Sequence, residues 1–412
     1  FIQIHMNNLP KSAYIHIPFC HRRCFYCDFS VIPIGDDVKN RDGLENRIIK
    51  DYLNILIKEI LSIKHKTSLS TIYIGGGTPS ILNPLQIGEL IKILKINFGI
   101  DNGAEITMEI DPASFEEKDL YGFISAGVNR FSLGAQSFNN QILKKAGRRH
   151  KSKDVKKSCN LLSNAKDQNL IKSWSLDLIQ NLPQSGFDIW RLDLENALKF
   201  SPPHISIYDL IVEDGTLFKK LQDKGLLNLP NEVQSYENSE LTSILLKKSG
   251  YTRYEISNYS IPGHQSRHNR VYWNGLGWWS FGLGSTSCPW GVKLTRPRSN
   301  RDYKKWVFEQ CEINLDKSLV RSSHKDLDLD EKLMLGLRLK EGINIKRIFR
   351  ENGWDEKTVQ INFDKLIKIW ERYSSSGLLC NEGDRYFLSD PKGMELSNQI
   401  LVSMFEWWEK VN

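Results

Sequence analysis

The sequence predicts an α/β protein with a partial (β/α)6 barrel, followed by an accessory segment and a small C-terminal winged-helix-like domain. Strand-like apolar runs alternate with helical patterns from residue 13 to about residue 212, as in repeated βα units around a parallel sheet. After residue 212 the alternation stops, and the end of the chain combines helical patterns with a hairpin. Six βα units are too few for an eight-stranded barrel, so we expect an open barrel with ligand groups at the carboxyl ends of its strands.

The predicted barrel contains six strands with amphipathic helices between them. The strands are expected at Ala13–Ile17, Thr71–Ile74, Glu105–Ile110, Arg130–Leu133, Trp174–Ile179 and His204–Leu210. A helix with one broad apolar face is expected between the first two strands, because apolar residues recur every four positions at Leu44, Ile48, Tyr52, Leu56 and Ile60. A second helix is expected to begin at Asn83-Pro84, since Asn is a favoured cap and Pro fits the first helical turn.

Three regions are expected along the chain: the barrel at residues 1–215, the accessory segment at 216–300 and the C-terminal domain at 301–412. The accessory segment has a long helical pattern up to Gly250, and then a stretch rich in aromatic residues and glycine from Tyr251 to Trp290. A charged segment around residues 296–330 has the composition of a linker. Beyond it, a hairpin of Gly377–Cys380 with Tyr386–Leu388 is expected between helical patterns.

The composition is that of a globular protein with ample material for a core: 412 residues, of which 40% are hydrophobic and 25% charged. The formal net charge of +7 is scattered along the chain, which is typical of a Lys-rich solvated surface; it also suits an anionic ligand or a weak preference for a membrane surface without requiring either. No apolar run reaches the roughly 18 residues that a membrane span needs.

The seven cysteines indicate the redox compartment. Their odd number and the lack of a signal-peptide pattern favour a reducing compartment, so we expect a cytoplasmic protein with the option of peripheral membrane association. Four isolated cysteines are expected to be buried structural thiols: Cys159, Cys288, Cys311 and Cys380.

The other three cysteines form the most informative motif of the chain. Cys20, Cys24 and Cys27 have the spacing CxxxCxxC directly after the first predicted strand. Three thiolates on one loop can hold three irons of a [4Fe–4S] cube and leave the fourth iron open. The alternative is a zinc site, which normally needs a fourth Cys or His ligand; His16 and His21 are the nearest candidates.

Polar and glycine residues follow the other predicted strands. The run Gly75-Gly76-Gly77-Thr78-Pro79 follows the second strand, Glu109 closes the third, Gln136 follows the fourth and Asp177 lies late in the fifth. Arg148 comes shortly after the fourth strand. A carboxylate is chemically suited to sugar hydroxyls and an Arg to a carboxylate. Each of these residues alone would also suit an ion pair at the surface or the rim of the barrel.

With these motifs, residues 13 to about 212 resemble the radical S-adenosylmethionine (SAM) superfamily. The resemblance implies a [4Fe–4S] cluster on the cysteine triplet, with SAM chelated to its open iron and cleaved by an electron from the cluster. It also implies that SAM is contacted by a set of strand-end and loop residues: Tyr14, Tyr26, Gly76, Gly77, Thr78, Glu109, Gln136, Arg148 and Asp177.

Within the superfamily, the chain resembles the branch that contains oxygen-independent coproporphyrinogen III oxidases (HemN) and the related HemW-like haem chaperones. The segments Tyr14–Cys20 and Leu333–Arg338 carry this resemblance. HemN proteins typically have a further Cys two positions after the third, where this chain has Phe29. At Asn181 family members usually have Gly, and we expect the turn to survive because Asn tolerates left-handed backbone.

A second motif, His268-Asn269-Arg270-Val271-Tyr272-Trp273, matches the HNxxYW pattern of HemW-like proteins. A neutral imidazole is a good axial ligand for haem iron, so the resemblance implies that His268, Tyr272 and Trp273 contact haem. Trp278 and Trp279 are expected to add aromatic surface for the porphyrin, and the other candidate ligands are His264 and His150. The alternative is that the His-Asn pair caps a loop.

The function that this resemblance implies is that of a haem chaperone, with haem, a haem-acceptor protein and a reductant for the cluster as partners. One alternative is a coproporphyrinogen III oxidase, which decarboxylates propionate side chains by a radical mechanism. A second is nucleic-acid binding through the C-terminal domain, which the many Asp and Glu residues after residue 331 disfavour. The sequence leaves open whether SAM is cleaved in turnover.

Overall fold

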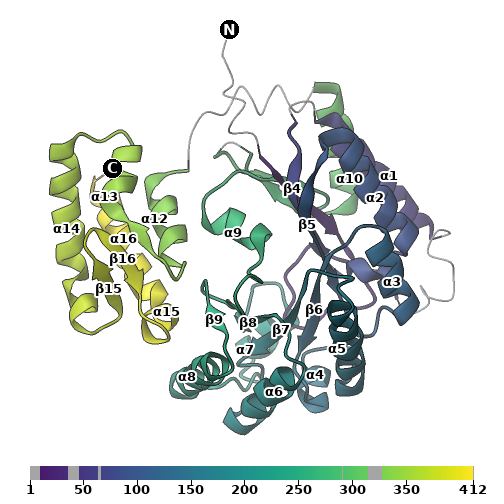
Figure 1. The fold of residues 1–412 in the computed structure, drawn as a ribbon, viewed down its shortest axis with the longest axis horizontal. Coiled ribbons are helices and arrows are strands. Elements are labelled where there is room, and N and C mark those ends of the chain that lie inside the picture. Colours follow the sequence, from purple (N-terminus) through teal and green to yellow (C-terminus); the bar gives the residue numbers. More distant parts are fainter. Residues whose placement is uncertain (1–9, 36–45, 64–65, 290, 314–326, 412) are drawn as a thin grey trace. The chain divides into compact units, whose positions relative to one another are not determined.

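The computed structural model describes residues 10–35, 46–63, 66–289, 291–313 and 327–411 (Figure 1). The chain forms two compact units. The first contains Phe1–Pro230 and Gly277–His324, and the second contains Asn231–Leu276 and Lys325–Asn412. The expected division into three regions stays a prediction, and the units group the residues differently because the segment 216–300 contributes to both of them.

The first unit is built on a parallel sheet with the strand order β11-β1-β4-β5-β6-β7-β8. Six of its strands overlap the predicted ones: β1 (Ser12–Ile17), β4 (Leu69–Gly76), β5 (Ile100–Ile110), β6 (Arg130–Gln136), β7 (Ser173–Gln180) and β8 (His204–Asp209). The strand β11 (Trp279–Phe281) was not predicted and pairs in parallel with β1, with Trp279 opposite Ala13. The predicted α/β class with an open barrel is confirmed.

Helices cover the outer face of this sheet, as Figure 1 shows for α1, α2, α3 and α5. The bounds of the helices in the first unit are α1 (Arg47–Ser62), α2 (Pro84–Phe98), α3 (Glu117–Ser125), α4 (Asn140–Lys145), α5 (Ser152–Asp167), α6 (Phe187–Lys199), α7 (Leu217–Asp223) and α10 (Asn300–Ile313). Short elements complete the unit: β2 (Phe19–Cys20), β3 (Ile32–Pro33), the 3-10 turn η3 (Pro79–Ile81), β12 (Thr286–Ser287) and β13 (Leu294–Thr295).

The helices α1 and α2 follow the sequence predictions closely. Tyr52, Leu56 and Ile60 of α1 are buried as expected, whereas Ile48 is 50% exposed and Leu44 lies outside the described residues. Helix α2 begins at its predicted cap: Asn83 Oδ1 accepts a hydrogen bond from the backbone N–H of Gln86 at 2.9 Å, and the Gln86 side chain accepts one from Asn83 N–H at 3.0 Å.

The linker expected around residues 296–330 is wrong for its first part, because Asn300–Ile313 forms the helix α10. Residues 314–326 lie outside the described residues. One charge next to this helix is used internally: Arg296 Nε donates to Glu59 Oε1 of α1 at 2.7 Å, and the Tyr303 hydroxyl donates to Glu59 Oε2 at 2.6 Å. Both Glu59 and Arg296 are only 1% exposed. Arg296 therefore belongs to a buried ion pair and not to a solvated linker.

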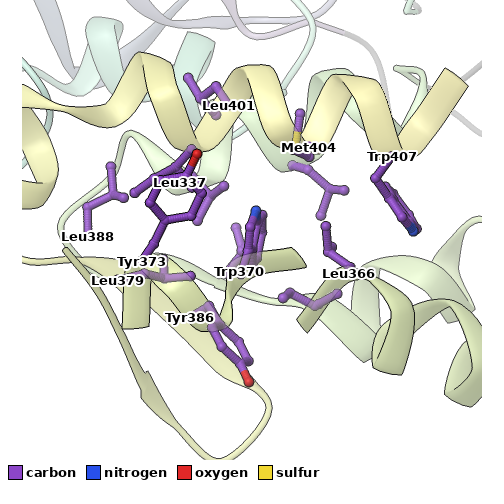
Figure 2. Packing of buried hydrophobic residues seen from close by; sticks show 14 of the residues in the cluster. Leu337, Leu366, Trp370, Tyr373, Leu379, Tyr386, Leu388, Leu401, Met404 and Trp407 are labelled. Carbon is purple, nitrogen blue, oxygen red and sulfur yellow. The ribbon is translucent and has the colours of Figure 1, made fainter. Parts of the chain in front are cut away.

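The second unit has its own hydrophobic core. In Figure 2, Leu366 and Trp370 of α14 lie with Met404 and Trp407 of α16 in one cluster of buried side chains. A three-stranded sheet of order β14-β16-β15 includes the predicted hairpin. The elements of this unit are α8 (Glu232–Lys248), β9 (Thr252–Arg253), β10 (Asn258–Ser260), α9 (Arg267–Trp273), α12 (Leu329–Leu337), β14 (Ile343–Asn344), α13 (Ile345–Glu351), α14 (Glu356–Ser375), β15 (Leu379–Glu382), β16 (Arg385–Leu388), α15 (Lys392–Glu395) and α16 (Ser397–Val411).

The prediction that the isolated cysteines are buried holds for most of those that the structure describes. Cys159 and Cys288 are buried, whereas Cys380 is half-buried, and the side chain of Cys311 lies outside the described residues. Within the described ranges, none of the helices is both long and apolar enough to cross a membrane.

The buried pair of Arg296 and Glu59 leads to a stability prediction. Arg296→Met leaves the Glu59 carboxylate buried without its cation, so we expect the free energy of unfolding to fall by about 3–5 kcal/mol. The measurement is a chemical denaturation curve. Arg47→Met is the matched control, because Arg47 pairs with Asp51 at 3.8 Å with 92% of its side chain exposed. We expect that control to change stability by less than about 1 kcal/mol; equal losses in both variants would contradict the prediction.

Candidate functional site

The loop that carries the three cysteines is held by short backbone pairings. Strand β2, which contains Cys20, pairs in parallel with β3, and Ile34 N–H donates to Cys20 O at 2.8 Å. Arg23 ties the other end of the loop, because its guanidinium donates to Cys27 O at 3.1 Å and to Phe29 O at 2.8 Å. These contacts fix the path of the loop directly after β1.

The glycine run after β4 lies against this loop. Gly76 has a φ of 122°, which glycine adopts without strain. A Cβ atom on Gly77 would lie 2.6 Å from Phe19 O and 2.8 Å from Cys20 Sγ, so no side chain fits there. The Thr78 hydroxyl oxygen is 3.7 Å from Cys20 Sγ. The glycines are therefore required for the close approach of the turn to the first cysteine.

A cavity of about 390 Å³ lies at the carboxyl ends of the strands in the first unit. It brings together the cysteine triplet and nearly all of the residues predicted to bind SAM: Cys20, Cys24, Cys27, Tyr26, Gly76, Gly77, Thr78, Glu109, Gln136, Arg148 and Asp177. Tyr14 is the exception among the predicted residues, since it is not in the cavity lining that the described residues form. Its ring stacks on Tyr73, and its hydroxyl lies 3.1 Å from His16 Nδ1.

The thiols fit an iron–sulfur cube better than a zinc ion. In the part of the chain that the structure describes, no three Cys, His, Asp or Glu side chains are placed to hold one metal ion. The two candidate fourth ligands are engaged elsewhere: His16 Nε2 is 2.9 Å from Ser30 O, and His21 Nδ1 is 2.9 Å from Gly35 O. A cube does not need thiols that converge on one point, because each thiolate binds a different iron.

Two carboxylates, Glu109 on β5 and Asp177 on β7, lie on the strands on either side of β6 and are held in fixed positions. Glu109 Oε1 accepts from the Tyr73 hydroxyl at 2.9 Å, and Oε2 accepts from Gly76 N–H at 3.0 Å. Burial raises the pKa of Glu109 to about 7, and the charge of Asp177 acts in the same direction. Asp177 accepts from Ser132 at 2.6 Å and from Ser175 at 2.7 Å, and burial raises its pKa as well. Both groups can accept hydrogen bonds from ligand hydroxyls.

The guanidinium of Arg148 crosses the mouth of the barrel. Nη2 donates to Asp111 Oδ2 at 2.5 Å and to Gly134 O at 3.0 Å, while Nη1 is 3.3 Å from Cys24 Sγ. Burial opposes ionisation of Asp111, but Arg148 and His150 outweigh it and lower the pKa of that carboxyl group. Asp111 was not among the residues predicted to line the site. The sequence clue to Asp111 is its position two residues after Glu109, because residues two apart in an extended segment point to the same side.

Two non-glycine residues at this edge have left-handed backbone. Gln136 has a φ of 66° at the irregularity in the pairing of β6 with β7. Asn181 has a φ of 64°, so the turn after β7 survives without Gly, as predicted. Its side chain donates to Asp209 Oδ1 at 2.6 Å, which adds a contact that Gly cannot make.

The residues predicted to contact haem lie in the second unit. His268 belongs to α9 and is 1% exposed, and its Nε2 lies 2.8 Å from the hydroxyl oxygen of Tyr272. Tyr272 and Trp273 are half-buried. Trp279 was expected to offer aromatic surface for the porphyrin, but it is fully buried in β11 of the first unit and packs against Phe98.

The other two histidine candidates differ in burial. His150 is 2% exposed in the first unit, and its Nε2 donates to Ala135 O at 2.9 Å. His264 is half-buried in the second unit. The residues predicted to contact haem are therefore divided between the two units. His264, His268, Tyr272 and Trp273 belong to the second unit, whereas His150, Trp278 and Trp279 belong to the first.

Comparisons with known proteins agree with the motifs. Residues 14–173 match the family model of the Radical SAM superfamily. A protein of Synechocystis sp. named "Heme chaperone HemW" is 35% identical over 407 residues, which are 96% of this chain and 97% of that protein. The chain belongs to the HemW family. HemW proteins of Lactococcus lactis and Bacillus subtilis are 33% and 32% identical and also align over 95% of this chain.

A solved structure supports the fold. Coproporphyrinogen III oxidase (HemN) from Escherichia coli, described as a radical SAM enzyme, superimposes with a TM-score of 0.76 and covers 96% of this chain and 90% of its own. Its sequence is 21% identical, so this likeness concerns the fold alone. The HemW-family chain thus shares the architecture of HemN.

The raised pKa of Glu109 gives this HemW-family chain a specific dependence of stability on pH. Because its pKa is about 7 in the folded chain and 4.5 ordinarily, the folded state binds this proton more tightly than the unfolded state. The contribution is fully present below pH 4.5 and is lost as the pH rises through 7. A difference of about 2.5 in pKa corresponds to at most about 3.4 kcal/mol.

We therefore expect Glu109→Gln to remove part of the fall in unfolding free energy between pH 4.5 and 7. Denaturation of the metal-free protein at several pH values measures it. Glu117→Gln, at an exposed position of α3, is the control and should keep the wild-type slope. Parallel pH profiles for wild type and Glu109→Gln would refute the assignment.

Proposed function

We propose that this protein is a haem chaperone, which binds haem and passes it to an acceptor protein. The observation that carries the proposal is the similarity to proteins named "Heme chaperone HemW" over 95% or more of this chain and 96% or more of theirs. The reducing compartment expected from the cysteines makes the cytoplasm the proposed location, with a reductant for the cluster as a further partner.

In this proposal Cys20, Cys24 and Cys27 hold a [4Fe–4S] cluster in the cavity of the first unit. The bound cluster would supply an open iron for the amino and carboxylate groups of SAM and an electron for its sulfonium. Glu109 and Asp177 are assigned to hydrogen bonds with ribose hydroxyls, and the assignment is supported by the internal donors that fix both carboxylates at the cavity. The remaining assignments are Tyr26, Gly76, Gly77, Thr78, Gln136 and Arg148, which line the same cavity, with Tyr14 behind them on β1.

For haem, we propose the segment around His268 in the second unit. Its imidazole is a suitable axial ligand, and Tyr272 and Trp273 supply half-buried aromatic surface beside it. Because His268 Nε2 lies 2.8 Å from the Tyr272 hydroxyl, ligation through this nitrogen requires that contact to break. The bound state therefore differs from the present one in the position of Tyr272.

The competing function is that of a coproporphyrinogen III oxidase, whose fold this chain shares. The specific observation against it is the position two residues after Cys27, where Phe29 is 60% exposed and offers no thiol. We regard Phe29 as part of the rim of the cavity, which it lines together with the cysteine loop.

The first test is cluster assembly in the purified protein. After anaerobic reconstitution, we expect the wild-type chain to hold about four irons with a broad charge-transfer absorption, and to bind both SAM and haem in titrations. Cys24→Ala should lose most of the cluster, whereas Cys159→Ala should keep it, because Cys159 is a buried thiol of α5. Formation of protoporphyrinogen from coproporphyrinogen III by the same preparation would overturn the choice of chaperone over oxidase.

The second test concerns the haem ligand. Tyr272→Phe removes the competitor for Nε2, so we expect haem to bind roughly fivefold more tightly, which corresponds to about one hydrogen bond. His268→Ala should weaken binding by at least about tenfold and shift the Soret band. His264→Ala is the matched control and should do neither. Unchanged affinity and spectrum in His268→Ala would show that haem binds elsewhere.

A further inference from the structure

A buried guanidinium lies against one of the three thiols of the cavity. Arg148 Nη1 is 3.3 Å from Cys24 Sγ and 3.5 Å from the Tyr26 hydroxyl oxygen. Only 13% of the Arg148 side chain is exposed. A positive charge at this distance acts strongly on a thiolate, because little water screens the interaction.

The guanidinium is held in place from its other side. Asp111 Oδ2 accepts from Nη2 at 2.5 Å, and Gly134 O accepts from the same nitrogen at 3.0 Å. Behind Asp111, His150 Nδ1 lies 3.5 Å from the same carboxylate oxygen, with the imidazole fully buried. The charges therefore form a row that leads from Cys24 through Arg148 to Asp111, and none of these groups can turn away without losing a partner.

These contacts also limit the further hydrogen bonds that Arg148 can make. Its Nη atoms are committed to Asp111, Gly134, Tyr26 and Cys24, and its Nε is buried without a hydrogen-bond partner in the described structure. The side chain is thus oriented by the protein before any ligand enters. An Arg fixed in this way by a carboxylate differs from a mobile surface Arg, because its charge stays at one distance from the thiol.

We propose that Asp111 is a positioning residue that holds Arg148 against Cys24 and offsets part of its charge, so that this pair sets the reduction potential of the cluster. The inference rests on the proposed function, which assigns the cluster to the cysteine triplet. Cluster potentials respond to nearby charge and to hydrogen bonds to sulfur. The guanidinium stabilises the more negative, reduced cluster and raises the potential, and the Asp111 carboxylate acts in the opposite direction.

The test is a potentiometric titration of the full-length, reconstituted protein at one pH, followed by electron paramagnetic resonance of the reduced cluster. Arg148→Met should lower the midpoint potential, because it removes the cation. Asp111→Asn should raise it, because Asn keeps a hydrogen-bond acceptor for Nη2 but removes the negative charge. Asp193→Asn is the control: Asp193 is a buried carboxylate of α6 that accepts from Ser137 and Phe138 N–H and does not line the cavity. We expect the control to keep the wild-type potential.

Opposite shifts in the two variants, with equal iron content, would support the inference. Shifts of the same sign, or a potential for Asp111→Asn at or below the wild-type value, would overturn it. A merely structural role of the two residues would not move the potential in opposite directions. If Arg148→Met assembles no cluster, Asp111→Asn decides by itself. A wild-type protein that assembles no cluster would contradict the proposed cofactor, which is a separate and recognisable result.

Discussion

The first unit depends on one close approach between two backbone segments, the turn after β4 and the cysteine loop after β1. Gly77 N–H donates to Ile17 O at 2.8 Å, and Thr78 N–H donates to Phe19 O at 2.7 Å, so the pairing of the two strands continues past the end of the sheet. A side chain at Gly77 would collide with this pairing. The position of the first thiol therefore follows from main-chain hydrogen bonds, which are less tolerant of displacement than apolar packing.

Much of this fold was predictable because its strands are buried and parallel. Such strands read as nearly continuous apolar runs, and six of them stood out in the sequence. Strand β11 did not, since Trp279–Phe281 has only three residues and its partner β1 lies at the other end of the chain. The helix α10 was hidden for a different reason. Its segment looked like a charged linker, but the fold buries Arg296 against Glu59, and a sequence does not show which charges will meet.

Part of the candidate site could be predicted, because the place of a residue near the end of a strand follows from that strand alone. Glu109 and Asp177 lie in the last parts of parallel strands, and the carboxyl ends of such strands meet at one edge, so their common cavity could be expected. Asp111 was missed because a single sequence does not show that Arg148, far away along the chain, would need a carboxylate. The expectation for Trp279 was wrong because an aromatic side chain packs in a hydrophobic core as readily as against a planar ligand. Only the pairing of β11 with β1 shows that Trp279 belongs to the core.

The hydrogen bond between His268 and Tyr272 is relevant to the proposed function of a haem chaperone. A carrier must release its cargo, so an axial ligand that binds iron as tightly as possible would be a disadvantage. In α9 the imidazole has an internal partner, the Tyr272 hydroxyl, which lies 2.8 Å from Nε2, the nitrogen that the proposal assigns to haem iron. If His268 ligates haem as proposed, each binding event must break this contact and each release restores it, which would lower the affinity by about 1 kcal/mol or more. In the proposed site, the hydroxyl that competes with haem for Nε2 is thus the group that favours transfer over storage.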